Sequence, residues 1–281
     1  MDLMDETRRM CPNCRAFITT RDRVCPYCGE KVGPRAVDRR DTAGMIGGLI
    51  PHARAATSIL LLINFGLFIA TVLVSMGREA GGAMGVDGQT LADFGAKWGP
   101  AMFGGHQWWR LVTAGFLHGG LIHILMNSWV LFDLGAMVEE AYGWARMLVI
   151  YLAATITGFY ASLWWAPYGL SVGASAAIMG LLGAMIALTV RSRSSAAAAY
   201  RGFFVRWAIY GLAIGLLPGL HIDNAAHLGG LAGGFAVGYL AGTPKLLANS
   251  LNERFWRAAA YMSIGVAGIA FLLMYQALAR G

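Results

Sequence analysis

Long apolar segments separated by short polar ones dominate the chain after residue 55. A helix needs about 20 predominantly apolar residues to cross the hydrocarbon core of a bilayer. Seven segments fit this length, which predicts an all-α polytopic membrane protein with seven spans. We place the spans at residues 56–76, 111–134, 147–166, 173–190, 203–220, 224–242 and 258–279.

Composition and charge agree with a protein of the bilayer. Hydrophobic residues make up 57% of the chain and charged residues only 13%, which departs from the soluble norm. The net charge of +7 could suggest nucleic acid, but the basic residues lie between the apolar segments rather than on one folded face. We therefore exclude a nucleic-acid partner and use the charge to orient the spans.

The basic residues are distributed asymmetrically between the two sides of the predicted membrane. With a cytoplasmic amino terminus, the outer side holds only Arg78, Lys97, Arg110 and Arg280, and the inner side holds the remaining basic residues near the spans. The positive-inside rule then predicts a cytoplasmic amino terminus and an external carboxy terminus in a prokaryotic plasma membrane. Residues 77–110 are long and partly apolar, so we expect them in the membrane interface.

All four cysteines lie in the first 28 residues, as the pairs Cys11-x-x-Cys14 and Cys25-x-x-Cys28-Gly29. Paired C-x-x-C units hold thiolates at the spacing of a tetrahedral metal site, and the glycine suits a tight turn. No signal peptide is expected before the first apolar segment, which places the cysteines in a reducing cytoplasm. Structural zinc is the favoured interpretation, with iron or a redox dithiol as alternatives.

A serine and a histidine lie on two predicted spans that carry matching small residues. Ser175 begins a span with Ala176, Gly180, Gly183 and Ala187 on one side, and His227 shares a helix face with Gly230, Gly234 and Gly238. Small residues let helices approach closely, so the two spans can bring Ser175 and His227 together. Each residue alone is also compatible with a packing role, but an ionisable residue in a span points to function.

Two further polar residues, His123 and Asn127, are four positions apart on the second span and so share a face. They could donate hydrogen bonds to a developing oxyanion or join helices as structural contacts. His118 lies off that face, and we expect it near the surface or a water pocket. A polar cavity around these residues would admit water.

Other chemistries fit the sequence less well. The spacing of His118 and His123 is not the His-Glu-x-x-His of a metalloprotease. Asp133 and Asp223 fall at opposite ends of the membrane, which excludes a shared-proton aspartyl pair. A metal site of His118, His123 and His227 stays open as an alternative.

These motifs occur together and in order, and with Trp109-Arg110 they make residues 56–242 resemble the rhomboid family of intramembrane serine proteases. The resemblance implies a six-helix core, to which this chain adds a seventh span. It also implies that Ser175 is the nucleophile, that His227 is the base, and that His123, Asn127 and the Ser175 N–H form the oxyanion hole. Trp109-Arg110 and Glu139 would be structural, and no cofactor is needed for catalysis.

One position departs from the family pattern, since Met179 stands where many relatives carry a tyrosine that stacks on the histidine. We expect Met179 to pack on the imidazole instead. The predicted organisation is then a zinc-ribbon-like cytoplasmic module, a basic linker, the rhomboid core, and a loop with the seventh span, over residues 1–33, 34–55, 56–242 and 243–281.

The predicted function is cleavage of transmembrane segments in other membrane proteins, with the lipid bilayer as the medium. The cysteine module could also recruit a cytoplasmic partner. One rival is an inactive protein that binds transmembrane clients, and retention of all four site residues argues against it. A transporter would show inverted repeats or ionisable residues through the bilayer, and the sequence has neither.

Overall fold

The computed structural model describes residues 8–11, 13–19, 22–32, 55–78, 85–192, 195–219, 222–242 and 250–280. Contacts divide the chain into two compact units, residues 1–51 and 52–281. The predicted linker, apart from its last residue, lies outside the described residues, as do residues 243–249 of the last predicted loop.

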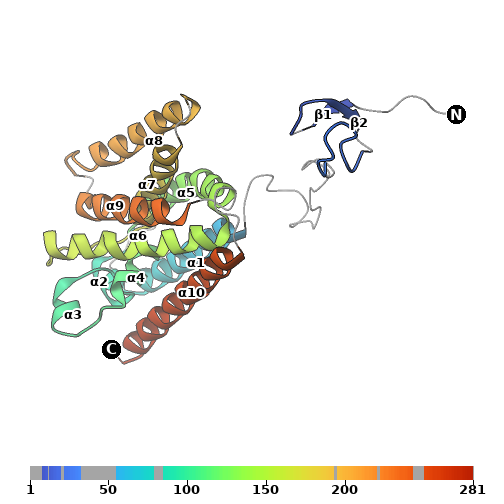
Figure 1. Ribbon diagram of the computed structural model, residues 1–281. Helices are drawn as coiled ribbons and strands as arrows, with labels where there is room; N and C mark the ends of the chain where they lie inside the picture. Colours follow the sequence, from blue (N-terminus) through green and yellow to red (C-terminus); the bar gives the residue numbers. More distant parts are fainter. Residues whose placement is uncertain are drawn as a thin grey trace. The chain divides into compact units, whose positions relative to one another are not determined.

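The first unit is a small two-stranded ribbon (Figure 1). Strands β1 (Arg8–Met10) and β2 (Phe17–Thr19) pair in antiparallel fashion, with Met10 opposite Phe17. Four buried side chains, Cys11, Ile18, Cys25 and Val32, form its whole described core. So small a core cannot stabilise a fold by itself, which fits a module held by metal.

The second unit is helical, as predicted, and its long helices are α1 (Ala55–Gly77), α5 (Leu121–Tyr142), α6 (Trp144–Trp165), α7 (Ser175–Arg191), α8 (Ser195–Ile214), α9 (Asn224–Ala241) and α10 (Ser250–Leu278). Short helices α2 (Gly88–Asp93), α3 (Gly99–Phe103), α4 (Arg110–Thr113) and η2 (Ala114–Phe116) lie between α1 and α5. Within the described residues, α1, α5, α6 and most of α10 are long and apolar enough to cross a bilayer, and α7 is a shorter apolar helix.

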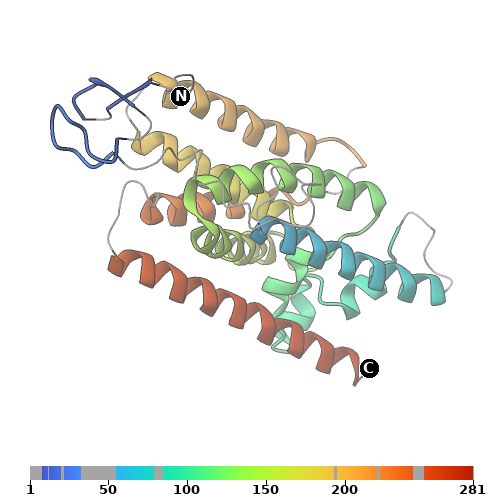
Figure 2. The same ribbon diagram turned by 90° about the vertical axis from the view of Figure 1, so that its right-hand side faces the viewer.

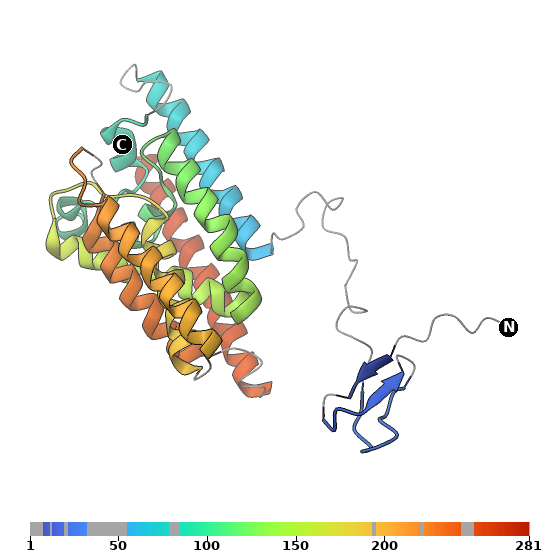
Figure 3. The ribbon, with the colours of Figure 1, turned by 90° about the horizontal axis from the view of Figure 1, so that it is seen from above.

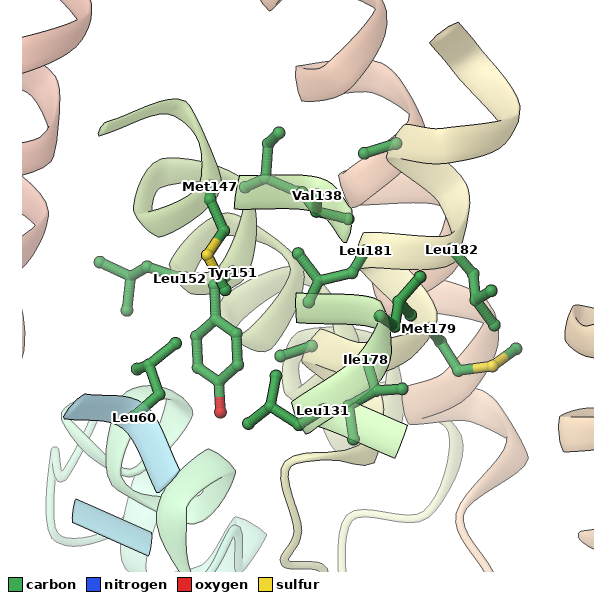
Figure 4. Close-up of a cluster of buried hydrophobic side chains, with 14 of the residues drawn as sticks. Leu60, Leu131, Val138, Met147, Tyr151, Leu152, Ile178, Met179, Leu181 and Leu182 are labelled. Atoms are coloured by element: carbon green, nitrogen blue, oxygen red, sulfur yellow. The ribbon is translucent and has the colours of Figure 1, made fainter. Parts of the chain in front are cut away.

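Helices α6, α7 and α9 form the centre of this unit. Figures 1 and 2 show α8 and α10 on opposite sides of these three helices, and Figure 3 shows α1 and α5 side by side. Figure 4 shows the buried core beside them, in which Tyr151 of α6 lies among side chains from α1, α5 and α7.

Glycines bring α7 and α9 into backbone contact, as the small-residue pattern predicts. A Cβ at Gly230 would collide with the carbonyl of Ala176, and one at Gly234 would collide with the backbone of Gly180. The Tyr142 hydroxyl at the end of α5 then donates to the carbonyl of Ala184 on α7 at 2.7 Å. Close packing of α7 on α9 therefore sets the positions of the residues at the ends of these two helices.

The start of α1 is held by the Glu139 carboxylate of α5. Its oxygens accept hydrogen bonds from the backbone N–H groups of Ala56 and Thr57 at 3.2 and 3.0 Å, and from the Thr57 hydroxyl at 2.9 Å. The first N–H groups of a helix have no partner within it. Glu139 supplies those partners, in agreement with the structural role expected for it.

Two predicted spans were placed wrongly. The second was predicted to run from residue 111 to 134, but α4 and η2 end at Phe116 and α5 begins only at Leu121. The helix is interrupted at the glycine pair before α5. Gly119 accepts a hydrogen bond from the Val86 N–H, and Gly120 forms a β-bridge with Gly85. Hydropathy cannot detect such an extended pairing.

The fifth span was predicted at residues 203–220, whereas α8 covers Ser195–Ile214. The alanine run before Tyr200 favours helix and extends its start. Its end is followed by turns at Gly215 and Pro218, because proline disfavours helical geometry in the residue before it.

Candidate active site

The hydroxyl of Ser175 and the imidazole of His227 are in direct contact. Ser175 is the first residue of α7, His227 lies in the first turn of α9, and the Ser175 Oγ is 2.9 Å from the His227 Nε2. The residues are far apart in sequence, so the contact depends on the backbone packing of α7 against α9. His227 is only 6% exposed, whereas Ser175 is partly exposed, so the imidazole is enclosed and the serine stays partly accessible.

In the described part of the chain, no carboxylate bonds to the far side of the His227 imidazole. Among the described residues, His227 Nδ1 has no hydrogen-bond partner. The nearest acid in the chain, Asp223, instead caps α9 through the Ala226 N–H at 3.0 Å and accepts a short hydrogen bond from the Ser162 hydroxyl. Ser175 and His227 therefore meet without a hydrogen bond from a third, acidic side chain among the described residues.

The segment before Ser175 passes directly over His123 and Asn127 of α5. Gly173 has a φ of +131°, and a Cβ there would lie 2.7 Å from His123 Nε2 and 3.6 Å from Asn127 Nδ2. Only glycine leaves space for these side chains. The structure therefore brings both predicted residues to the loop that ends at Ser175.

Hydrogen-bond donors remain available at this point. Asn127 is 8% exposed, and its Nδ2 has no partner in the described part of the chain. Ser175 begins α7, so its backbone N–H is one of the four that have no acceptor within the helix. A buried donor without a partner is costly and suits a ligand that arrives with negative charge.

His118 was predicted near the surface or a water pocket, and the surface position is wrong. Its side chain is 0% exposed and packs edge-on against His123 with ring centroids 5.1 Å apart. The pairing of residues 119 and 120 with residues 85 and 86 folds the chain over it. The three-histidine metal site is also not formed, because within the described residues only the four cysteines bring metal-ligating atoms together.

The loop between α1 and α5 supports residues 166–174, the segment between α6 and α7 that we call the serine loop. The sequence did not indicate this support. Lys97 is fully buried, and its Nζ donates to the carbonyls of Ala166 and Gly169, each at 2.9 Å. Burial lowers the pKa of Lys97, opposed by the charge of Asp223. The one feature of the sequence that could have indicated this role is the presence of a lysine in a partly apolar loop.

Arg110 organises the same loop from the other side. Its guanidinium donates to the carbonyls of Ala92 and Ala96 at 2.6 and 2.9 Å and to the Gln107 side chain at 2.7 Å. These contacts match the structural role expected of Trp109-Arg110. Met179 is buried near Gly211 of α8, and its packing on the imidazole stays a prediction.

The four cysteines of the first unit form a second site. Their sulfur atoms lie within 4.8 Å of one another, with Cys11 to Cys28 and Cys14 to Cys25 each at 3.7 Å. A tetrahedral site with metal–sulfur bonds of about 2.3 Å needs sulfur atoms about 3.8 Å apart. The thiols therefore fit a tetrahedral metal.

The two cysteine turns have the same backbone form. Arg15 and Gly29, each directly after the second cysteine of its pair, have positive φ values of 60° and 72°. In each turn the residue after the second cysteine also donates its N–H to the carbonyl of the first cysteine. Hydrogen bonds, the largest from the Cys14 backbone, lower the pKa of the Cys11 thiol to about 7. The pKa of Cys14 is instead raised, because the lowering effect of the Ala16 backbone is outweighed by hydrogen bonds with the other thiols. A thiolate is the form that binds metal.

Comparison with known proteins agrees with both sites. The Rhomboid domain matches residues 105–244, and a zinc-ribbon domain matches residues 9–32. Rhomboid protease GluP of Bacillus subtilis (strain 168) is 38% identical over 178 residues, 63% of this chain and 34% of that protein. Rhomboid-like protease 2 of Toxoplasma gondii is 30% identical over 216 residues, 73% of this chain and 72% of that protein.

A plant protein gives a similar result, since RHOMBOID-like protein 6, mitochondrial, of Arabidopsis thaliana is 38% identical over 160 residues, covering 56% of this chain and 51% of that protein. The match to the Bacillus protein covers about a third of its length and that to the Arabidopsis protein about half. The chain belongs to the rhomboid family and is an integral, multi-pass membrane protein with an amino-terminal zinc-ribbon domain.

Proposed function

We propose that this protein is a serine endopeptidase that cleaves transmembrane segments of other membrane proteins. The observation that carries the proposal is the 2.9 Å contact between Ser175 Oγ and His227 Nε2. A nucleophile within hydrogen-bond reach of its base is the arrangement that covalent catalysis needs. The relatives named as proteases support the same reaction class.

In the proposed mechanism, Ser175 Oγ attacks the scissile carbonyl carbon while its proton passes to His227 Nε2. The carbonyl oxygen becomes an oxyanion, which His123, Asn127 and the Ser175 N–H stabilise. Each well-placed donor of this kind is worth about 3 kcal/mol in the transition state. The C–N bond then breaks, and His227 gives its proton to the leaving amine.

The second half of the reaction releases the enzyme. His227 takes a proton from a water molecule, the resulting hydroxide attacks the acyl carbon, and the proton returns to Ser175 Oγ as the ester bond breaks. A peptide bond inside a helix is shielded by the helix, so the substrate must unwind locally at the cleavage site. Small or helix-breaking residues are expected there.

The test compares cleavage of a labelled transmembrane substrate by the full chain and its variants in proteoliposomes. Ser175→Ala and His227→Ala should each abolish cleavage. Ser58→Ala and His106→Ala are matched controls, because the first removes a hydroxyl of α1 and the second removes an exposed imidazole. Equal cleavage by wild type and Ser175→Ala would contradict the mechanism.

The alternative is a catalytically inactive rhomboid-like protein that binds transmembrane clients. A fluorophosphonate probe separates the two functions without a known substrate, because it reacts with an activated serine. Labelling of the wild type at Ser175 supports the protease, whereas wild type that binds a transmembrane peptide but never reacts with the probe indicates the inactive protein.

We propose structural zinc at Cys11, Cys14, Cys25 and Cys28. Elemental analysis of the purified chain should find close to one zinc atom per molecule, and the double change Cys11→Ser with Cys14→Ser should abolish it. Tyr27→Ser, at an exposed side chain in the second cysteine turn, is the control. Iron in place of zinc, or intact thiols without metal, would contradict the assignment.

We further propose seven spans with a cytoplasmic amino terminus and an external carboxy terminus in a prokaryotic plasma membrane. The proposed domains are the cysteine module, the basic linker, the rhomboid core, and the last loop with the seventh span, over residues 1–33, 34–55, 56–242 and 243–281. The cysteine module is also proposed to recruit a cytoplasmic partner. The support is the excess of arginine and lysine in the segments assigned to the inner side. Labelling of a single cysteine added at either terminus with a membrane-impermeant reagent tests the topology.

A further inference from the structure

An apolar groove of about 560 Å³ opens between α1 and α10, with α6 at its base. Its lining comes from all three helices and includes Ile59, Ile63, Leu148, Leu152, Ile264 and Phe271. All three helices are long and apolar enough to span a bilayer. The groove therefore lies where lipid, rather than water, is the solvent.

The size of the groove suits a lipid acyl chain, because its lining is almost wholly apolar and the groove holds about 560 Å³. It lies within the range of about 300–1,000 Å³ that small ligands occupy, and an acyl chain has the required apolar surface.

One end of the groove has the chemistry of a lipid head-group region. Trp144 lines the groove at the start of α6 and packs against Tyr261 of α10, with ring centroids 5.8 Å apart. Tryptophan and tyrosine are enriched where a membrane meets water. The apolar part of the groove extends from this aromatic pair toward Phe271.

Positive charge lies at the same end. Arg257 is exposed and precedes Ile264 by seven residues, two helical turns, so it shares the face of α10 that lines the groove. Its nearest described acid, Glu253, is already paired with Arg146 at 2.7 Å. The Glu139 carboxylate also lies near this end, but it already accepts from the Ala56 and Thr57 N–H groups and the Thr57 hydroxyl. Because both carboxylates have partners, Arg257 can pair with an anionic head group.

We propose that this groove binds one anionic glycerophospholipid, with an acyl chain between α1 and α10 and the phosphate at Arg257. The bound chain supports α10, which reaches the middle of the molecule through Phe271 and its ring contact with Phe116 at 5.3 Å. This site does not depend on the proposed proteolysis, because its residues are separate from the dyad.

Two glycines of α10 provide a matched test. A Cβ at either Gly265 or Gly268 meets nothing within 4 Å, but only Gly268 lines the groove. Gly268→Leu should therefore fill the groove without a clash, whereas Gly265→Leu adds the same side chain elsewhere on the helix. Ala267→Leu is a second groove-filling variant in case the first is poorly produced.

The measurement is native mass spectrometry of the full chain in mild detergent after addition of phosphatidylglycerol or phosphatidylcholine. Wild type and Gly265→Leu should retain one phosphatidylglycerol, and Gly268→Leu should retain at least tenfold less. Arg257→Gln should remove the preference for phosphatidylglycerol. Equal retention by wild type and both groove-filling variants, or no preference between the two lipids in the wild type, would overturn the proposal.

Discussion

Lys97 and Ser171 exchange both of their backbone hydrogen bonds, although one residue lies in the loop after α1 and the other lies four residues before Ser175. The Lys97 N–H donates to the Ser171 carbonyl at 3.0 Å, and the Ser171 N–H donates to the Lys97 carbonyl at 3.1 Å. The Lys97 side chain adds two bonds to the carbonyls of Ala166 and Gly169. The loop between α1 and α5 is thus attached to the strand-like segment that positions the serine.

The first prediction follows from this attachment. Lys97→Met should lower the turnover rate by about ten- to a hundredfold, because a shift of about 1 Å in the serine loop costs that much. The expected loss is in turnover rather than in substrate affinity. Steady-state kinetics of the cleavage assay would measure it, with Lys31→Met, an exposed lysine of the cysteine module, as control. Unchanged turnover in Lys97→Met would exclude a positioning role.

The second prediction concerns the contact of α7 with α9. Gly234→Val should destabilise the protein by about 1–3 kcal/mol, because its side chain would overlap the backbone of Gly180. Cleavage should fall as well, since this packing sets the distance between Ser175 and His227. Gly66→Val is the control, because a Cβ at Gly66 of α1 meets nothing within 4 Å. Thermal unfolding in detergent would measure the stability of the two variants, and the cleavage assay would measure their activity. Equal losses in Gly234→Val and Gly66→Val would contradict the role of glycine packing.

The third prediction concerns the start of α1. Glu139→Gln should cost about 1–3 kcal/mol, because the amide places a donor against backbone N–H groups that now donate to a carboxylate. Asp133→Asn removes a carboxylate from an exposed position on the same helix and should be close to neutral. The comparison of their unfolding temperatures is the measurement. Equal unfolding temperatures for the two variants would contradict a specific contribution from the Glu139 hydrogen bonds.

The fourth prediction is a pH dependence that arises outside the spans. The Thr90 hydroxyl, followed by other hydrogen bonds, lowers the pKa of Asp87 to about 2. The unfolded value is about 3.9, so the stabilisation from Asp87 is complete above about pH 5 and is lost as the pH falls toward 2. Asp87 also accepts from Ser75 at the end of α1 at 2.8 Å, and therefore joins α1 to α2.

Unfolding temperatures measured from pH 7 to pH 2 would test this effect. The wild type should lose stability below about pH 4, and Asp87→Asn should show a weaker dependence over the same range, because it has no carboxylate to protonate. Parallel curves for the two proteins would assign the acid sensitivity to other groups.

The sequence by itself determined most of the helical plan. Runs of apolar residues located α1, α6, α7 and α9 close to their observed positions, because the bilayer fixes the length of a span. They also located the end of α10, but this helix begins at Ser250, eight residues before the predicted start. The cysteine spacing predicted a tetrahedral set of thiols, because a C-x-x-C turn is local and needs no distant contact. The small residues before and after Ser175 and His227 indicated which helices pack closely.

The tertiary structure decided what depends on segments far apart in the chain. Residues 85 and 86 pair with residues 119 and 120, and this interrupted the predicted second span and buried His118. The positive φ of Gly173 against His123, and the bonds from Lys97 to the serine loop, likewise involve contacts over long sequence separations. Hydropathy and motif spacing describe neighbours along the chain, whereas these contacts form only when α7 and α9 have packed and the loops have closed over them.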